Sequence, residues 1–154
     1  MPELPEVETT VSDLRPHVVG RTFKMVEVYI PRMVKAPAAA EFERLLPGRR
    51  IESVERRGKF ILFNLDQGVL VAHMMMGGAL MWRAAAEAPA QYTRMRFAFA
   101  DGSEMWLVNP RTLGWCWLTD EAEQVVGHLG PDALDPAFTV GYFAERLAGR
   151  SAPI

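Results

Sequence analysis

The sequence predicts an α+β fold dominated by strands: an antiparallel two-layer β-sandwich, or flattened barrel, flanked by an N-terminal helix and further short helices. Seven or eight short strand-like segments follow one another at close spacing, with turn residues between them. One well-signalled amphipathic helix precedes them. The 154 residues suit a single domain, which buries roughly two-thirds of the surface that its unfolded chain exposes.

The N-terminal helix is expected to have Pro5 in its first turn and Gly20 as its C-terminal stop. Proline suits a first helical turn because its missing N–H would have no partner there, and nearby acidic residues complement the positive end of the helix dipole. Apolar residues recur at spacings of four, three and four, which predicts a stripe that must pack against the rest of the fold. Its members are Val7, Val11, Leu14 and Val18.

The remaining elements follow in chain order. Strand patterns cover residues 22–30, 51–57, 59–65, 69–75, 92–100, 104–108 and 115–118, and helical patterns cover 38–46, 121–127 and 139–148. Period-two alternation in 92–100 predicts one buried and one solvent-facing side. The residues expected on the buried side are Met95, Phe97 and Phe99. The pair Asp101-Gly102 is typical of a tight hairpin turn.

Composition excludes several classes of protein. Hydrophobic residues at 49% and charged residues at 23% are not those of a disordered chain, a collagen or a bare coiled coil. The apolar runs are far shorter than the roughly 20 residues that span a membrane, and the acidic, proline-rich start is unlike a signal peptide. A single cysteine, Cys116, excludes an internal disulfide and a cysteine-based zinc site within the chain. We therefore expect a soluble intracellular domain.

Charge is unevenly distributed along the chain. The net charge of −2 argues against a nucleic-acid partner when taken alone. However, residues 15–59 hold eleven Lys or Arg against five acids, whereas residues 119–145 hold six acids and no Lys or Arg. A polyanion could bind the first segment. An unevenly charged solvated surface explains the same counts without any partner.

The first three residues could carry chemistry. Cellular aminopeptidases remove a Met that precedes a small residue, so Pro2 would be left as a free secondary amine. An α-amino group titrates near 8, so much of it is neutral and nucleophilic at physiological pH. Attack on a carbonyl-equivalent carbon gives an iminium, and Glu3 stands beside it as a general acid. From these residues alone, an inert proline-capped helix start is the better interpretation.

Five motifs change that interpretation. The sequence after Met1 reads PELPEVET, and further motifs follow in chain order: RRGKF at 56–60, HMMMGGAL at 73–80, NPRTLG at 109–114 and HLGP at 128–131. Together they resemble the formamidopyrimidine-DNA glycosylase/endonuclease VIII (Fpg/Nei) family of bacterial base-excision repair enzymes. The third and fourth resemble the family patterns HLxMxGxL and DPRRFG, and the last resembles HLGPEPL. The first is unusually specific, because it must begin at the terminus where the nucleophile is made.

The resemblance implies a catalytic set. Pro2 would attack C1′ of the damaged nucleotide and form a Schiff base, while Glu3 would act as the acid for base loss and ring opening. Lys59 would contact a phosphate and assist the strand-cleaving elimination. Removal of Met1 is required, because an amide nitrogen at residue 2 could not form the Schiff base. Without the resemblance, Lys59 would be read as a solvent-facing strand lysine.

The resemblance also implies residues that fill the gap left by an extruded base. Met76, Arg111 and Leu113 match the family's three void-filling positions, which are typically Met, Arg and Phe. Leu113 loses the stacking ring, which puts the opposite-base or lesion preference in question. Tyr92 falls near a DNA-contacting histidine of the family. We interpret His73 as a buried or backbone-bonded scaffold residue.

The family context predicts partners and missing parts. Its members continue into a helix-two-turn-helix domain and a zinc finger, so we expect residues 1–154 to be the N-terminal catalytic domain of a longer enzyme, with a natural short homologue as the alternative. Zinc is expected only in that finger, and no cofactor in this chain. The expected partner is damaged double-stranded DNA, bound by a monomer in the bacterial cytoplasm at the nucleoid. The 154 residues alone should bind DNA weakly, with little turnover.

Three functional hypotheses remain at this stage. The first is a DNA glycosylase/AP lyase acting on oxidised purines by β,δ-elimination, with the oxidised pyrimidines of the Nei branch as the alternative substrates. The second is a catalytically silent domain of the same family that binds damaged DNA. The third is an unrelated β-sandwich whose N-terminus matches by chance.

Overall fold

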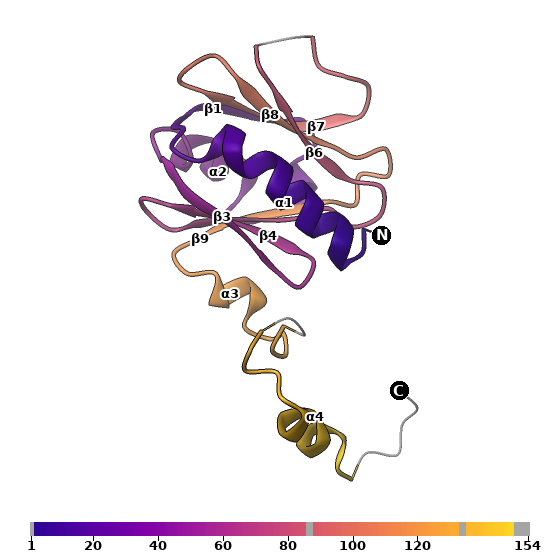
Figure 1. Cartoon of the computed structure of the whole chain (residues 1–154). Coiled ribbons are helices and arrows are strands. Elements are labelled where there is room, and N and C mark those ends of the chain that lie inside the picture. Colours follow the sequence, from indigo (N-terminus) through magenta and orange to yellow (C-terminus); the bar gives the residue numbers. More distant parts are fainter. Residues whose placement is uncertain (1, 86–87, 133–134, 150–154) are drawn as a thin grey trace.

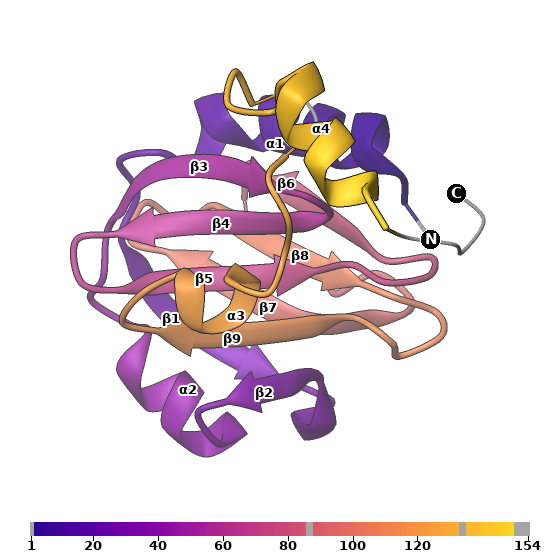
Figure 2. The same cartoon turned by 90° about the horizontal axis from the view of Figure 1, so that it is seen from below.

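The computed structural model describes residues 2–85, 88–132 and 135–149, in which two β-sheets pack face to face (Figures 1 and 2). The four-stranded sheet has the order β1-β7-β8-β6 and the five-stranded sheet the order β2-β9-β5-β4-β3. All neighbouring strands are antiparallel except β2 and β9, which run parallel. The predicted α+β sandwich with flanking helices is therefore confirmed.

The strands have the following bounds. The four-stranded sheet consists of β1 (Phe23–Val28), β6 (Ala79–Arg83), β7 (Thr93–Phe99) and β8 (Glu104–Val108). The five-stranded sheet consists of β2 (Val34–Ala36), β3 (Ile51–Arg57), β4 (Phe60–Leu65), β5 (Val69–His73) and β9 (Trp115–Thr119). The core lies between the sheets, where alternate residues of β7 are fully buried as the period-two pattern predicted.

Two helices close the open sides of the sandwich. Helix α1 (Leu4–Val18) packs on β3 and β6, the edge strands of the two sheets at one side. Helix α2 (Ala39–Leu45) packs on β1 and β2, the edge strands at the other side. Covering an edge strand protects its unpaired backbone groups. All four members of the predicted apolar stripe of α1 are buried, so this helix joins the sheets as expected.

Some boundaries differ from the sequence expectation. Helix α1 ends at Val18 with Val19 as its C-cap, and Gly20 follows with a positive φ of 83°, so it stops the helix as expected. Strands β2 and β6 were not predicted: β2 has only three residues, and β6 follows a glycine pair that reads as a turn. Lys59 lies in the turn between β3 and β4 and not in a strand.

The C-terminal part is smaller than the helical patterns suggested. Helix α3 (Glu123–Val126) packs on the outer face of the five-stranded sheet through Val126. The remaining short element, the 3-10 helix η1 (Pro31–Met33), lies in the N-terminal half and precedes β2. Helix α4 (Val140–Leu147) has no buried residue and lies beyond the sandwich (Figure 1). In the described part of the chain, no helix is long and apolar enough to cross a membrane.

Candidate active site and nucleic-acid interface

The start of α1 is held in a defined conformation. Glu3 is the N-cap residue of the helix, and its backbone N–H donates to the Glu6 carboxylate at 2.7 Å. Such a bond satisfies one of the donors that a helix start leaves unpaired. The Glu3 side chain is exposed and Pro2 is half-buried. Met1 lies outside the described residues. The two residues expected to carry the chemistry thus precede a capped helix.

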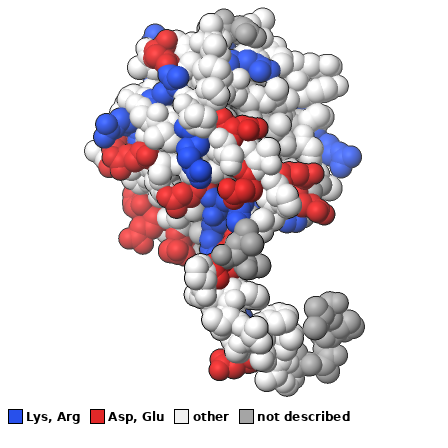
Figure 3. Space-filling view, in the orientation of Figure 1, with Lys and Arg blue, Asp and Glu red and all other residues white. Residues whose placement is uncertain are grey.

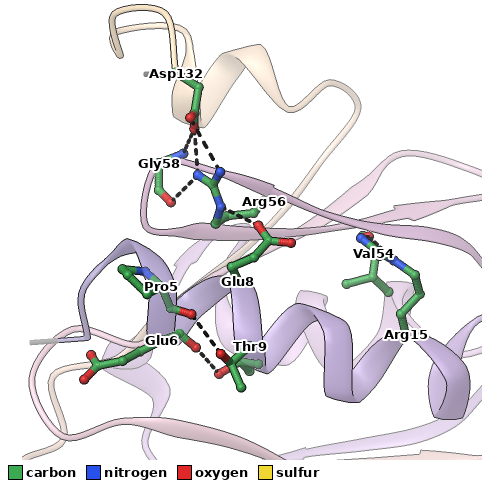
Figure 4. Close-up of polar contacts among 10 residues, drawn as sticks. Pro5, Glu6, Glu8, Thr9, Arg15, Val54, Arg56, Gly58 and Asp132 are labelled. Atoms are coloured by element: carbon green, nitrogen blue, oxygen red, sulfur yellow. Dashed lines mark hydrogen bonds and ion pairs between the residues drawn. The ribbon is translucent and has the colours of Figure 1, made fainter. Parts of the chain in front are cut away.

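Arg56 ties this helix to the β3–β4 turn. Its guanidinium donates to Glu8 on α1 at 2.7 Å, to the Gly58 carbonyl at 3.1 Å and to Asp132 at 2.6 Å (Figure 4). The Arg56 side chain is only 7% exposed, and Asp132 only 12%. The pKa of Arg56 is raised above its ordinary value, chiefly by the hydrogen bond to Asp132. A permanently charged side chain therefore joins three segments that are distant in the sequence.

The residues before α4 hold the same turn from its other side. The Gly58 N–H donates to Asp132 at 3.3 Å, and Arg57 donates to the Gly130 carbonyl at 2.8 Å. Gly58 has a positive φ of 58°, and a Cβ there would lie 3.3 Å from Leu129. These contacts fix the backbone of the two-residue turn that carries Lys59.

Lys59 lies near His73, at the end of β5. The pKa of His73 is lowered, first by burial and second by the positive charge of Lys59. Its Nδ1 accepts the Met75 N–H at 3.2 Å, so the neutral ring carries its proton on Nε2. His73 is therefore a buried, backbone-bonded residue, as the sequence interpretation had it.

Asn109 connects the two loops that carry the candidate void-filling residues. Its side chain is fully buried, donates to the Met74 carbonyl at 3.1 Å and accepts the Arg111 N–H at 2.9 Å. Its backbone N–H donates to the Tyr92 carbonyl at 3.0 Å, and its carbonyl accepts from Arg94 at 2.8 Å. One amide side chain thereby sets the relative positions of loops 74–78 and 109–114.

Met76 and Arg111 meet at the tips of these loops. The Arg111 guanidinium lies 3.7 Å from the Met76 sulfur, and both residues are exposed. Leu113 is half-buried. Tyr92 has a positive φ of 68°, is 44% exposed and lies with its ring 5.6 Å from the Arg94 guanidinium carbon. An exposed thioether beside an exposed guanidinium is a pair that could enter a gap between stacked bases.

The structure brings the candidate residues together to different degrees. Met76 and Arg111 are in contact, and Lys59 is near His73, which directly precedes the Met76 loop. Among the described residues, no hydrogen bond or ion pair joins Pro2 or Glu3 directly to Lys59; their connection runs through Glu8 and Arg56. Sequence reasoning missed the positioning roles of Arg56 and Asn109, although both stand inside the quoted motifs.

The basic segment is largely committed to internal contacts. Most guanidinium groups of residues 15–59 bind backbone carbonyls or carboxylates, as with Arg15 on Val54 and Arg49 on Leu45, and Arg32 bonds the Thr112 hydroxyl. The face in Figure 3 shows acidic and basic side chains interspersed rather than a continuous basic patch. The eleven positive charges therefore overstate what a polyanion could contact. Within the described ranges, no group of three or more His, Cys, Asp or Glu is arranged to hold a metal ion.

Comparison with known proteins gives consistent matches. The model of the formamidopyrimidine-DNA glycosylase N-terminal domain matches residues 1–116. The formamidopyrimidine-DNA glycosylase of Acidothermus cellulolyticus is 42% identical over 97% of this chain and 55% of the relative. That of Symbiobacterium thermophilum is 40% identical over 100% of this chain and 52% of the relative. The chain thus spans about half the length of these relatives.

A solved structure has the same fold. In a complex between the Lactococcus lactis Fpg and abasic-site DNA, the protein is 27% identical and superposes with a TM-score of 0.84. The match covers 95% of this chain and 55% of that one. A second Lactococcus lactis complex, noncovalently bound to DNA with an AP site, gives a TM-score of 0.83 at 28% identity.

Proposed function

Because this chain belongs to the formamidopyrimidine-DNA glycosylase family through its N-terminal domain, we propose that it is the catalytic domain of a bifunctional DNA glycosylase/AP lyase. The proposed substrates are oxidised purines in duplex DNA, with 8-oxoguanine and formamidopyrimidines first among them. The relatives crystallised with abasic-site DNA support DNA as the partner. The family match makes the chance-resemblance hypothesis wrong.

Pro2 and Glu3 carry out the first half of the proposed reaction. The free Pro2 nitrogen forms a bond to C1′ while the bond from C1′ to the base breaks, and the base leaves with the electron pair and a proton. Glu3 assists proton transfer as the sugar ring opens to the iminium. The iminium then withdraws electrons, so loss of a C2′ proton expels the 3′ phosphate. Loss of a C4′ proton then drives a second elimination that expels the 5′ phosphate, and water hydrolyses the iminium to release the free Pro2 amine.

Lys59 serves the second half. Its ammonium contacts a phosphate of the damaged strand and assists the proton transfer of the elimination. The observation that carries the proposal is the network of Glu8, Arg56 and Asp132, which anchors both the helix that follows Pro2 and Glu3 and the turn that holds Lys59 (Figure 4). Preorganised geometry of this kind lowers the barrier because no reorientation is needed.

Met76, Arg111 and Leu113 fill the gap left by the extruded nucleotide, and Tyr92 contacts the DNA nearby. The contact between Met76 and Arg111, and the shared anchor at Asn109, support a concerted entry of both loops. Extrusion costs a few kcal/mol of stacking and pairing, which inserted side chains partly offset. Leucine at 113 offers apolar area without a ring, so discrimination of the opposite base is weaker than with phenylalanine.

The rest of the proposal concerns the whole protein. The helix-two-turn-helix and zinc-finger domains of the family would occupy the length that the relatives have and this chain does not cover. Zinc belongs to that finger. The relatives are bacterial, and we place the protein in the bacterial cytoplasm, at the nucleoid, as a monomer.

Borohydride trapping on duplex DNA with 8-oxoguanine or an abasic site tests the proposal. The full-length protein, with its N-terminus verified as Pro2 by mass spectrometry, yields a covalent adduct. Pro2→Gly and Glu3→Gln abolish or strongly reduce it, whereas Glu41→Gln, at an exposed position of α2, traps like the wild type. If a protein with a verified free Pro2 forms no adduct, the proposed lyase activity is refuted.

A second candidate function is a catalytically silent domain that binds damaged DNA, favoured by leucine at position 113. It predicts lesion-dependent binding without strand cleavage. Single-turnover nicking separates the two, because only the lyase converts bound substrate to product. An oxidised-pyrimidine substrate in the same assay tests the Nei-type alternative.

A further inference from the structure

A row of side chains crosses the outer face of the five-stranded sheet. Trp115 on β9 pairs in register with His73 on β5, which in turn pairs with Phe60 on β4. The ring centroids of Trp115 and His73 are 6.3 Å apart, and those of His73 and Phe60 are 4.6 Å apart. Lys59 directly precedes Phe60 at one end of this row.

Lys35 occupies the other end. It lies on β2, the edge strand that runs beside β9, and its Nζ is 4.7 Å from the centroid of the Trp115 ring. Val34 before it is buried in the core, whereas Lys35 is exposed, so the lysine faces the same side as Trp115. A cation over an indole face is held by the ring quadrupole while its charge stays in water.

The row lies at the base of the two loops that carry Met76 and Arg111. Loop 74–78 follows His73 directly, and loop 109–114 leads directly into Trp115. Side chains that enter the base stack from these tips bring the adjacent sugar-phosphate backbone over the residues at the loop bases. The three strand intervals from β2 to β4, at about 4.8 Å each, separate the two ends of the row by about 14 Å. Lys35 and Lys59 therefore reach different phosphates.

Three cations lie at this end of the sheet: Lys35, Lys59 and Arg111. The ion pairs found among the described residues engage arginines at 21, 44, 50, 56 and 96, and none involves Lys35, Lys59 or Arg111. Arg32 in η1, three residues before Lys35, bonds the neutral hydroxyl of Thr112. Cations without carboxylate partners are the ones whose charge is available to phosphate.

We infer that Lys35, braced on Trp115, is a phosphate contact for duplex DNA that extends the interface across the sheet from Lys59. The inference rests on the proposed function, since it needs DNA at the Met76 and Arg111 loops. It assigns Trp115 as the positioning residue that holds the ammonium at the edge of the sheet. Neither residue belongs to the catalytic set.

The salt dependence of binding tests this inference. The full-length protein is titrated against a duplex with one tetrahydrofuran abasic analogue at a series of KCl concentrations. Loss of one phosphate contact reduces the magnitude of the slope of log K against log[salt] by about 0.9. The ratio of the wild-type binding constant to that of Lys35→Ala therefore falls about 3.5-fold between 50 and 200 mM KCl. Lys35→Arg keeps the wild-type slope. Lys24→Ala, an exposed lysine on β1 of the other sheet, is the matched control and also keeps it.

Two further readouts complete the test. Trp115→Leu weakens binding about two- to fivefold at fixed salt and leaves the slope unchanged, because the charge remains. The rate of borohydride trapping at saturating DNA stays at the wild-type value in Lys35→Ala. The inference is overturned if Lys35→Ala keeps the wild-type salt slope, or if Lys24→Ala lowers the slope by the same amount. In either case, borohydride trapping by the wild type leaves the proposed function standing. A wild type that neither binds nor traps overturns the proposed function itself.

Discussion

Replacing Arg56 by methionine is predicted to destabilise this chain by about 3–5 kcal/mol, the usual cost of removing one partner of a buried ion pair. Arg56 is 7% exposed and Asp132 is 12% exposed, so Arg56→Met removes the charged hydrogen bonds that a poorly solvated carboxylate accepts from this guanidinium. The bond to Glu8 adds little, because Glu8 is 46% exposed and such pairs contribute about 0–1 kcal/mol. A loss of this size is a large share of a typical total of about 5–15 kcal/mol.

Urea denaturation measures this loss as a shift of the midpoint at constant m-value. In the double variant Arg56→Met/Asp132→Asn, the buried carboxylate that lost Arg56 is replaced by a neutral amide, whose oxygen can still accept the Gly58 N–H. We therefore expect the double variant to be at least about 1 kcal/mol more stable than Arg56→Met alone. Arg57→Met, which loses one bond to a carbonyl, is the control. A single-variant loss below about 1 kcal/mol, or additive losses in the double variant, would refute the reasoning.

Three more predictions concern the site. Burial and Lys59 lower the pKa of His73 in the folded chain, so the unfolded chain binds more protons as pH falls through the ordinary histidine pKa of about 6.5. The free energy of unfolding should therefore decrease as pH falls through that value. Urea titrations at a series of pH values should show a smaller decrease in His73→Gln. Asn109→Ala should cost about 2–4 kcal/mol by leaving the Met74 carbonyl and Arg111 N–H unpaired, with faster proteolysis at both loops; equal proteolysis would contradict this. Gly78→Ala would place a Cβ 2.2 Å from the Met74 carbonyl oxygen, so melting should show a destabilisation above about 1 kcal/mol; an unchanged melting temperature would show that the loop adapts.

Local patterns explain why much of the fold could be read from the sequence. The stripe of α1 depends on spacings of three and four residues, and the alternation of β7 on a spacing of two, so both are visible within a dozen residues. The parallel pairing of β2 with β9 joins residues about 80 positions apart, such as Val34 and Cys116. A three-residue strand has too few side chains for any periodicity to be detected.

Charge could not be interpreted in the same way. The sequence counts eleven cations in residues 15–59 but does not say which of them bind the protein itself. The fold places Arg56 between Glu8 and Asp132, and it directs Arg15 onto the Val54 carbonyl. By contrast, the sequence assigned no individual role to Lys35, because only the pairing of β2 with β9 places it over Trp115.

The sequence by itself determined the family, the candidate residues and the chemistry open to them, because these reside in short contiguous motifs whose residue types carry their own reactivity. Tertiary structure alone decided how those motifs are held: Arg56 anchors the helix start and the Lys59 turn, and Asn109 anchors the Met76 and Arg111 loops. The physical reason is that a hydrogen bond or an ion pair depends on distances of a few ångströms in space, and separation along the chain does not specify them.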